Sequence, residues 1–277
     1  MEENRTSREY VADFREIINK VLVSFDKVDL EEIDRRNDKL DSLRPLPEAS
    51  LKSLEEKLAI DETHNSTAIE GNTLTLGETA LVIEKGITIS GKPLKDHLEI
   101  LGYNKALKFV KEIVKEKEKY PLNEDLIKEI HKILFKPMEN LEEEYDYGIG
   151  FYRKNQRFIK GSRHVLPRPE KIPELMEEFI NLINSTDIHP VKKAVLFHFG
   201  LTHIHPFADG NGRAARLLMN LILMRAGYTI VLIPLGKRTR YMDALEKASV
   251  QHDGKDFLSF IIESMNEVLD LYFSTVT

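Results

Sequence analysis

Apolar residues recur every three or four positions along most of this chain, which is the spacing of one face of an α-helix. The first such segment repeats through six apolar side chains: Tyr10, Phe14, Ile17, Ile18, Val21 and Phe25. The same spacing predicts further helices over residues 51–69, 75–84, 94–118, 124–135, 169–182, 190–204, 212–226, 238–249 and 254–273. The chain is therefore expected to be all-α.

One segment departs from this helical pattern. Residues 145–166 are rich in Gly, Tyr, Phe and Arg and have no helical period. Within them, Phe151–Arg153 and Gln156–Ile159 are short candidate strands. We expect a small β-hairpin over about residues 148–166, which is either an ordinary surface hairpin or a flap over a functional site.

Prolines indicate where the chain divides. Pro45 and Pro47 follow a polar stretch after the first helix, and such punctuation is typical of a connection between structural units. We predict an N-terminal helical extension over residues 1–45 and a main domain over residues 46–277. The length of 277 residues is sufficient for one large domain or two small ones.

Composition and charge exclude several classes of function. The 40 basic and 46 acidic residues give a net charge of −6, whereas general nucleic-acid binders carry a basic excess. The chain has no cysteine, which rules out a disulfide framework, a thiolate zinc site and a cysteine nucleophile. It shows no secretory signal and no apolar run long enough to span a bilayer. We expect a cytoplasmic protein that binds neither nucleic acid nor membrane.

The densest group of chemically useful residues lies between His205 and Arg216, in the run HPFADGNGRAAR. Gly210 and Gly212 allow a turn that leads into a predicted helix, and the free N–H groups and dipole of a helix N-terminus bind anions. Arg213 and Arg216 lie three residues apart on one helix face, where both guanidinium groups can bind phosphate oxygens. The run therefore predicts a phosphate-binding site.

Three further residues of the run suggest the reaction. Asp209 is a carboxylate beside a predicted phosphate site, which favours a divalent cation. His205 has an imidazole that titrates near neutral pH, so it is suited to act as a general base. Asn211 lies between the two glycines and can bond a phosphate through its side chain or backbone. Together with the arginines, these residues indicate phosphoryl or nucleotidyl transfer.

This run resembles the signature of the Fic family, H-x-F-x-D-G-N-G-R-x-x-R, and matches it at every specified position. The resemblance implies a Fic-type helical bundle that moves AMP from ATP to a hydroxyl of a target protein and releases pyrophosphate. It also implies that His205 is the catalytic base and that Asp209 holds Mg²⁺. The residues that it assigns to the nucleotide are Gly210, Asn211, Gly212, Arg213 and Arg216.

An upstream motif suggests regulation of this site. Ser66 and Glu70 share one helix face at i,i+4, a common arrangement for exposed polar residues, and Gly71 follows them. The three residues match the Fic inhibitory signature (S/T)-x-x-x-E-(G/N). The resemblance implies an inhibitory helix over about residues 51–71, in which Glu70 pairs with Arg216 and takes the place of a γ-phosphate. In some relatives the same glutamate supports removal of AMP, so both roles stay open.

The resemblance has two further implications. The predicted hairpin would hold an extended segment of the target protein by strand addition. The residues that we assign to target binding are Phe158, Ile159 and Lys160. Tyr241 would lie beside the nucleotide base, but Met242 stands where many relatives have a second tyrosine. UTP or GTP therefore stays open as an alternative to ATP.

Two functions of other classes also stay open. A metal hydrolase could use His198, His203, His205 and Asp209 as ligands, although this leaves the glycines and arginines of the run unexplained. A non-catalytic nucleotide-sensing module is a second alternative. Under the leading interpretation the partners are ATP, Mg²⁺ and a protein that presents a Ser, Thr or Tyr hydroxyl, with self-modification and a homodimer as further expectations.

Overall fold

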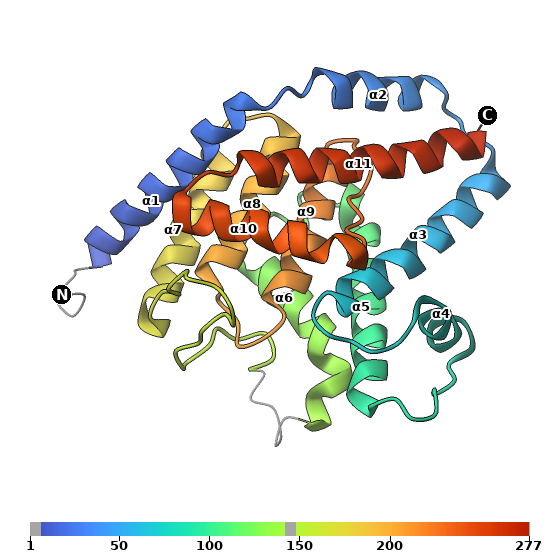
Figure 1. The fold of residues 1–277 in the computed structure, drawn as a ribbon, viewed down its shortest axis with the longest axis horizontal. Coiled ribbons are helices and arrows are strands. Elements are labelled where there is room, and N and C mark those ends of the chain that lie inside the picture. The colour runs from blue at the N-terminus through green and yellow to red at the C-terminus, as the bar shows by residue number, and fades with distance from the viewer. Residues whose placement is uncertain (1–6, 142–147, 277) are drawn as a thin grey trace.

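The computed structural model describes residues 7–141 and 148–276, and within these ranges it contains eleven α-helices and no β-strand (Figure 1). The α-helices are Ser7–Ser24 (α1), Glu31–Ser42 (α2), Glu48–Ala68 (α3), Leu76–Lys85 (α4), Leu94–Glu112 (α5), Glu124–Phe135 (α6), Ile172–Ser185 (α7), Pro190–Ile204 (α8), Asn211–Arg225 (α9), Arg238–Gln251 (α10) and Lys255–Val276 (α11). The short 3₁₀-helices are Phe25–Lys27, Ile113–Lys115, Lys136–Leu141, Pro169–Lys171 and Leu235–Lys237. The all-α prediction is confirmed. Residues 145–147, where the predicted non-helical segment begins, lie outside the described ranges.

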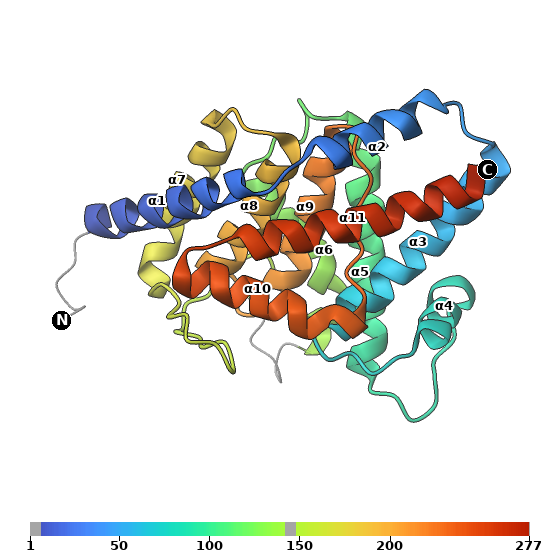
Figure 2. The same ribbon diagram turned by 45° about the horizontal axis from the view of Figure 1, so that its top comes forward.

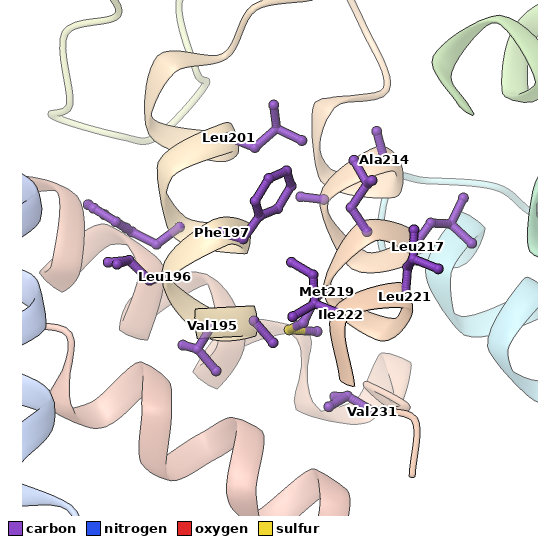
Figure 3. Close-up of a cluster of buried hydrophobic side chains, with 14 of the residues drawn as sticks. Val195, Leu196, Phe197, Leu201, Ala214, Leu217, Met219, Leu221, Ile222 and Val231 are labelled. Atoms are coloured by element: carbon purple, nitrogen blue, oxygen red, sulfur yellow. The ribbon is translucent and has the colours of Figure 1, made fainter. Parts of the chain in front are cut away.

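The centre of the fold is formed by α8 and α9, which pack against each other through apolar side chains (Figure 3). Most residues of both helices are buried, as expected for helices that other helices surround. Phe197 and Leu201 of α8 point toward α9, and Met219 of α9 lies on the side toward α8, within one hydrophobic core. Burial of each such side chain contributes roughly 1.5–3 kcal/mol to folding. The rigid pair therefore gives the loop between its helices a fixed base.

The other helices surround this pair. In both views α10 and α11 run side by side across α8 and α9, and α4 lies at the periphery (Figures 1 and 2). Helix α3 contacts α5, α9 and α11, which brings its C-terminal end to the start of α9. Among the described residues, every helix is too short or too polar to cross a membrane.

The two helices of the predicted N-terminal extension pack on the rest of the fold. Phe14 of α1 meets Phe179 of α7 edge to face, with 6.0 Å between the ring centroids. Ile33 and Leu40 of α2 belong to the same hydrophobic core as α8 and α9. Helix α2 was absent from the prediction because it is mostly charged and buries few residues. The domain boundary near residue 45 stays a prediction.

The β-hairpin predicted over residues 148–166 is not found: this segment, which we name the flap loop, contains no strand. Its backbone groups bond to neighbouring elements instead of forming a ladder. The N–H of Arg153, for example, donates to the carbonyl of Pro206 at 2.8 Å. The two limbs of the loop are linked by the side chain of Gln156, which donates to the carbonyl of Leu166 at 2.9 Å.

Candidate functional site

A cavity of about 360 Å³ brings together residues of both sequence motifs and of the flap loop. The predicted site residues that line it are Glu70, Ile159, Lys160, His205, Gly212, Arg216 and Tyr241. A larger hollow of about 900 Å³ lies between α1 and α7, but none of the described residues that line it belongs to either motif. The smaller cavity is therefore the candidate site.

The loop between α8 and α9 is held in one conformation by its own side chains. Phe207 is fully buried, and the amide of Asn211 accepts from its N–H and donates to its carbonyl, both at 2.9 Å. Gly210 has φ 79°, and a Cβ there would lie 2.3 Å from Cε2 of Phe135, so the position requires glycine. Because the side-chain amide of Asn211 is already bonded within the loop, the backbone N–H of Asn211 is the group that a phosphate could contact.

His205 follows α8 in a left-handed conformation, with φ 54° and ψ 57°. Its Nδ1 lies 3.3 Å from the carbonyl of Thr202. Because a carbonyl only accepts, Nδ1 carries the proton and Nε2 keeps its lone pair. Burial, aided by the nearby Arg153 guanidinium, lowers the pKa of His205 to about 4. The imidazole is therefore neutral at pH 7, which is the protonation state that a general base requires.

The carboxylate of Glu70 lies at the N-terminal end of α9. Its Oε1 accepts from Nη2 of Arg216 at 2.8 Å, and a Cβ on Gly212 would lie 2.5 Å from the same oxygen. Ser66 also binds this arginine: its Oγ accepts from Nε at 2.6 Å and its carbonyl from Nη2 at 2.8 Å. Helix N-termini attract anions, and the Glu70 carboxylate is the anionic group that lies at this end of α9.

The end of α3 presents Glu70 in this position. Helix α3 ends at Ala68, and Gly71 has φ 106°, a conformation that favours glycine. The chain therefore turns away from the helix directly after Glu70. The Glu70 side chain keeps 29% of its surface exposed on the cavity, whereas that of Arg216 keeps only 5%.

Asp209 and Arg213 form a second charged pair beside the loop. Oδ1 of Asp209 lies 3.0 Å from Nη2 of Arg213, whose Nη1 donates to Oε1 of Glu99 at 3.1 Å. Burial opposes ionisation of Asp209, but the Arg213 guanidinium and the N–H of Gly210 prevail and lower the pKa of its carboxyl. Asp209 is therefore an anion at pH 7, as a cation ligand must be.

The described residues fit Mg²⁺ as part of a nucleotide complex and not as a protein-only site. Mg²⁺ is commonly held by one or two carboxylates together with substrate phosphates and water, and Asp209 supplies one ionised carboxylate. Within residues 7–141 and 148–276, no three His, Asp or Glu side chains converge on a common point. His198 and His203 are instead buried in the core. This contradicts the metal-hydrolase alternative.

Tyr241 lines the cavity from α10 but is almost fully buried. Its hydroxyl accepts from Nη1 of Arg216 at 3.4 Å and lies 2.9 Å from Nε2 of His198. Burial and the positive Arg216 lower the pKa of His198 to about 3, so this imidazole is neutral at pH 7. Tyr241 thus contacts Arg216 directly, while contact with a nucleotide base stays a prediction.

The flap loop places the predicted target-binding residues differently. Ile159 and Lys160 line the cavity, whereas Phe158 lies outside it and is 82% exposed. The turn that follows is fixed to α10, because the N–H of Arg163 donates to Oε1 of Glu246 at 2.8 Å. One wall of the cavity is therefore a tethered loop.

Two residues whose roles the sequence patterns did not predict hold the candidate site together. Arg153 is buried in the flap loop, and its Nε donates to the carbonyl of His205 at 2.9 Å. His131 of α6 is also buried, and its Nε2 donates to the carbonyl of Asp209 at 3.0 Å. Arg153 stands out in the sequence only as part of a candidate strand and His131 belongs to no motif, because a single His or Arg at such a position gives no signal of its role in one sequence.

Comparisons with known proteins identify the family of this chain. The model of the Fic/DOC family matches residues 121–223. A Fic domain containing signaling protein from Bacteroides thetaiotaomicron is 30% identical, and the match has a TM-score of 0.80 and covers 88% of this chain and 96% of that protein chain. Fic-1 from C. elegans is 27% identical, with a TM-score of 0.78 over 95% of this chain and 72% of that chain. This chain belongs to the Fic/DOC family.

Curated relatives extend the comparison. The Protein adenylyltransferase Fic of Culex quinquefasciatus is 35% identical over 255 residues, which are 91% of this chain and 49% of that protein. The protein of the same name in Aedes aegypti is 36% identical over 256 residues, again 91% of this chain and 49% of the relative. The chain thus spans about half the length of the curated relatives that it matches.

Proposed function

We propose that this chain is a protein adenylyltransferase, which moves AMP from ATP to a Ser, Thr or Tyr hydroxyl of a target protein, and that Glu70 restrains it. One observation carries the proposal: His205, the anion site at the start of α9 and the Glu70 carboxylate share one cavity. The names of the curated relatives support the same activity.

Each group then has one task in the reaction. The target hydroxyl attacks the α-phosphorus of ATP and gives its proton to Nε2 of His205, while the bond to the bridging oxygen breaks and pyrophosphate leaves. Arg216 and the N–H groups at the start of α9 stabilise the negative charge on the phosphates. Mg²⁺, held by Asp209, would neutralise part of the charge on the leaving pyrophosphate.

Glu70 conflicts with this arrangement. A terminal phosphate must replace its carboxylate beside Gly212 and Arg216. While the carboxylate stays, the α-phosphate is displaced from His205, and a displacement of about 1 Å can cost about 10²-fold in rate. Because Glu70 lines the same cavity as His205, it is also placed to direct a water molecule for removal of AMP, which is the second candidate function.

The test uses wild type, Glu70→Gly and the double variant Glu70→Gly/His205→Ala. Each is incubated with Mg-ATP labelled on the α- or the γ-phosphate, and we measure pyrophosphate release and intact mass. The expected result is release of pyrophosphate and an AMP adduct with Glu70→Gly, little with wild type and none with the double variant. Label transferred from the γ-phosphate would instead show phosphorylation and overturn the proposal.

The same incubation with UTP and GTP decides the nucleotide, since Tyr241 and Met242 do not fix it. An adduct with UTP or GTP and none with ATP would show that the chain transfers another nucleotide and not AMP. Incubation with a protein that already carries AMP tests the second candidate function, which is removal of AMP. If wild type removes the AMP and Glu70→Gly does not, the chain has that function. A cytoplasmic location and a homodimer remain predictions from the sequence.

A further inference from the structure

Positive charge is concentrated in the flap loop and the two residues that follow it. Residues 148–168 contain six Lys or Arg and no Asp or Glu, whereas the rest of the chain has 34 basic and 46 acidic residues. Opposite charges steer partners and select among them. A basic segment on an acidic protein therefore requires an explanation that the reaction at His205 does not supply.

Not all of these charges serve the fold. Arg153 is buried and holds the backbone of the catalytic loop. Lys154, Lys160 and Arg168 are exposed, and no carboxylate of the described residues lies within ion-pair distance of them. Arg163 is also exposed, and among the carboxylates of the described residues only that of Glu246 lies within ion-pair distance, with its Oε1 3.9 Å from Nε of Arg163. The loop thus presents positive charge to a partner.

Apolar side chains stand among these charges. Phe158 is 82% exposed and Val165 66% exposed, so both leave apolar surface in water. Lys160 and Ile159, beside Phe158, line the cavity that also contains His205. Any target segment that brings a hydroxyl to His205 must therefore pass this combination of positive charge and apolar surface.

We infer that the tip of the flap loop, formed by Phe158, Lys160 and Arg163, selects target segments in which acidic residues flank the modified hydroxyl. The inference rests on the proposed function and adds to it the class of target. The carboxylates of the segment pair with Lys160 and Arg163, and an apolar neighbour covers Phe158. The nucleotide does not explain these charges, because Arg216 and the start of α9 already form its anion site.

Synthetic peptides test the inference directly. Ser-, Thr- and Tyr-centred peptides with Glu, Gln or Lys flanks are offered to Glu70→Gly with labelled Mg-ATP, and kcat/KM is measured for each. We expect Glu flanks to exceed Lys flanks by about tenfold, since each exposed ion pair contributes a modest amount. Raising the salt concentration should reduce this preference, because salt screens exposed charges.

Charge reversal provides the matched comparison. Lys160→Glu/Arg163→Glu in the Glu70→Gly background should reverse the preference toward Lys flanks. Lys52→Glu makes a similar change at an exposed position of α3 that does not line the cavity, and it should leave the preference unchanged. Equal kcat/KM for Glu and Lys flanks, or a preference that the double reversal leaves intact, would overturn the inference.

Peptide binding separates this inference from the proposed function. Fluorescence anisotropy of the same peptides with Glu70→Gly/His205→Ala needs no transfer, so it reports target selection even if no AMP moves. Tighter binding of the Glu-flanked peptide that the double reversal abolishes supports the inference. The double charge reversal could instead leave peptide binding unchanged and abolish only the modification of one copy of the chain by another. The loop tip would then bind a second copy of the chain, and the inference would be wrong.

Discussion

Replacing Glu70 separates the effect of its charge from the effect of its bulk. Glu70→Gly removes the carboxylate from Nη2 of Arg216 and from the surface of Gly212. Glu70→Gln keeps the length of the side chain and an oxygen that accepts a hydrogen bond, but removes the charge. In both variants Arg216 keeps its two bonds to Ser66, at 2.6 and 2.8 Å, so the guanidinium stays in place to receive a phosphate.

The size of the effect follows from the contact that a phosphate must replace. A hydrogen bond to a charged group contributes about 1.5–3 kcal/mol and a neutral one about 0.5–1.5 kcal/mol. At about 1.4 kcal/mol for each factor of ten, Glu70→Gly should increase the rate of AMP transfer by about 10- to 100-fold. Glu70→Gln loses only the charged part of the contact, so its rate should lie between those of wild type and Glu70→Gly.

The assay is the initial rate of labelled AMP transfer at saturating Mg-ATP, with ATP affinity measured by calorimetry. We expect kcat to change more than the Kd of ATP, because Glu70 interferes with the placement of the phosphates and less with the rest of the nucleotide. Glu56→Gln, an exposed change on the same helix, is the control and should have no effect. A Glu70→Gln rate equal to wild type would show that charge is not the restraint and refute this reasoning.

Three other perturbations have definite outcomes. Gly212→Ala should abolish transfer in the Glu70→Gly background, because its Cβ would fill the place that the carboxylate leaves; a retained rate would contradict the assigned phosphate position. The rate of Glu70→Gly should stay flat from pH 6 to 8, since burial lowers the pKa of His205 to about 4; a tenfold decrease per pH unit below 6.5 would show that the base has an ordinary pKa. Burial raises the pKa of Glu62 to about 7, so between pH 4.5 and 7 this carboxyl is ionised in the unfolded chain but still protonated in the folded one. The free energy of unfolding, measured with urea, should therefore fall by about 3 kcal/mol as pH rises through this range, relative to Glu62→Gln. Parallel plots of unfolding free energy against pH for the two proteins would mean that Glu62 ionises normally.

Helix positions could be predicted where apolar residues repeat, and could not where burial is slight. The repeats near α8 and α9 mark helices whose residues are mostly buried. Helix α2 buries only Ile33, Asn37 and Leu40, so its sequence is almost entirely polar and has too few apolar residues to mark a helix face. The prediction of a hairpin in the flap loop was wrong for another reason. Its candidate strands have residues that are typical of strands, but their backbone groups bond to partners elsewhere in the fold, such as Pro206.

Within the candidate site, contiguous motifs could be predicted and supporting contacts could not. The run from His205 to Arg216 forms one loop and helix start, so its residues are necessarily close together. Arg153 and His131 reach the same loop from other elements. Their contribution depends on backbone carbonyls, which are the same in every sequence, and only the folded structure shows which carbonyl each side chain meets.

The contact between α3 and α9 explains how Glu70 comes to lie beside residues that are far from it in sequence. Glu62, Ser66 and Glu70 lie one helical turn apart, and so do Gly212, Arg216 and Asn220 on α9. The two rows meet in antiparallel order: Asn220 donates to Glu62 at 2.9 Å, Arg216 to Ser66 at 2.6 Å, and Glu70 lies against Gly212. A slip by one turn would move α3 by about 5.4 Å and leave buried polar groups without partners, which is costly. The buried pairs below therefore fix the register that places Glu70 on the anion site.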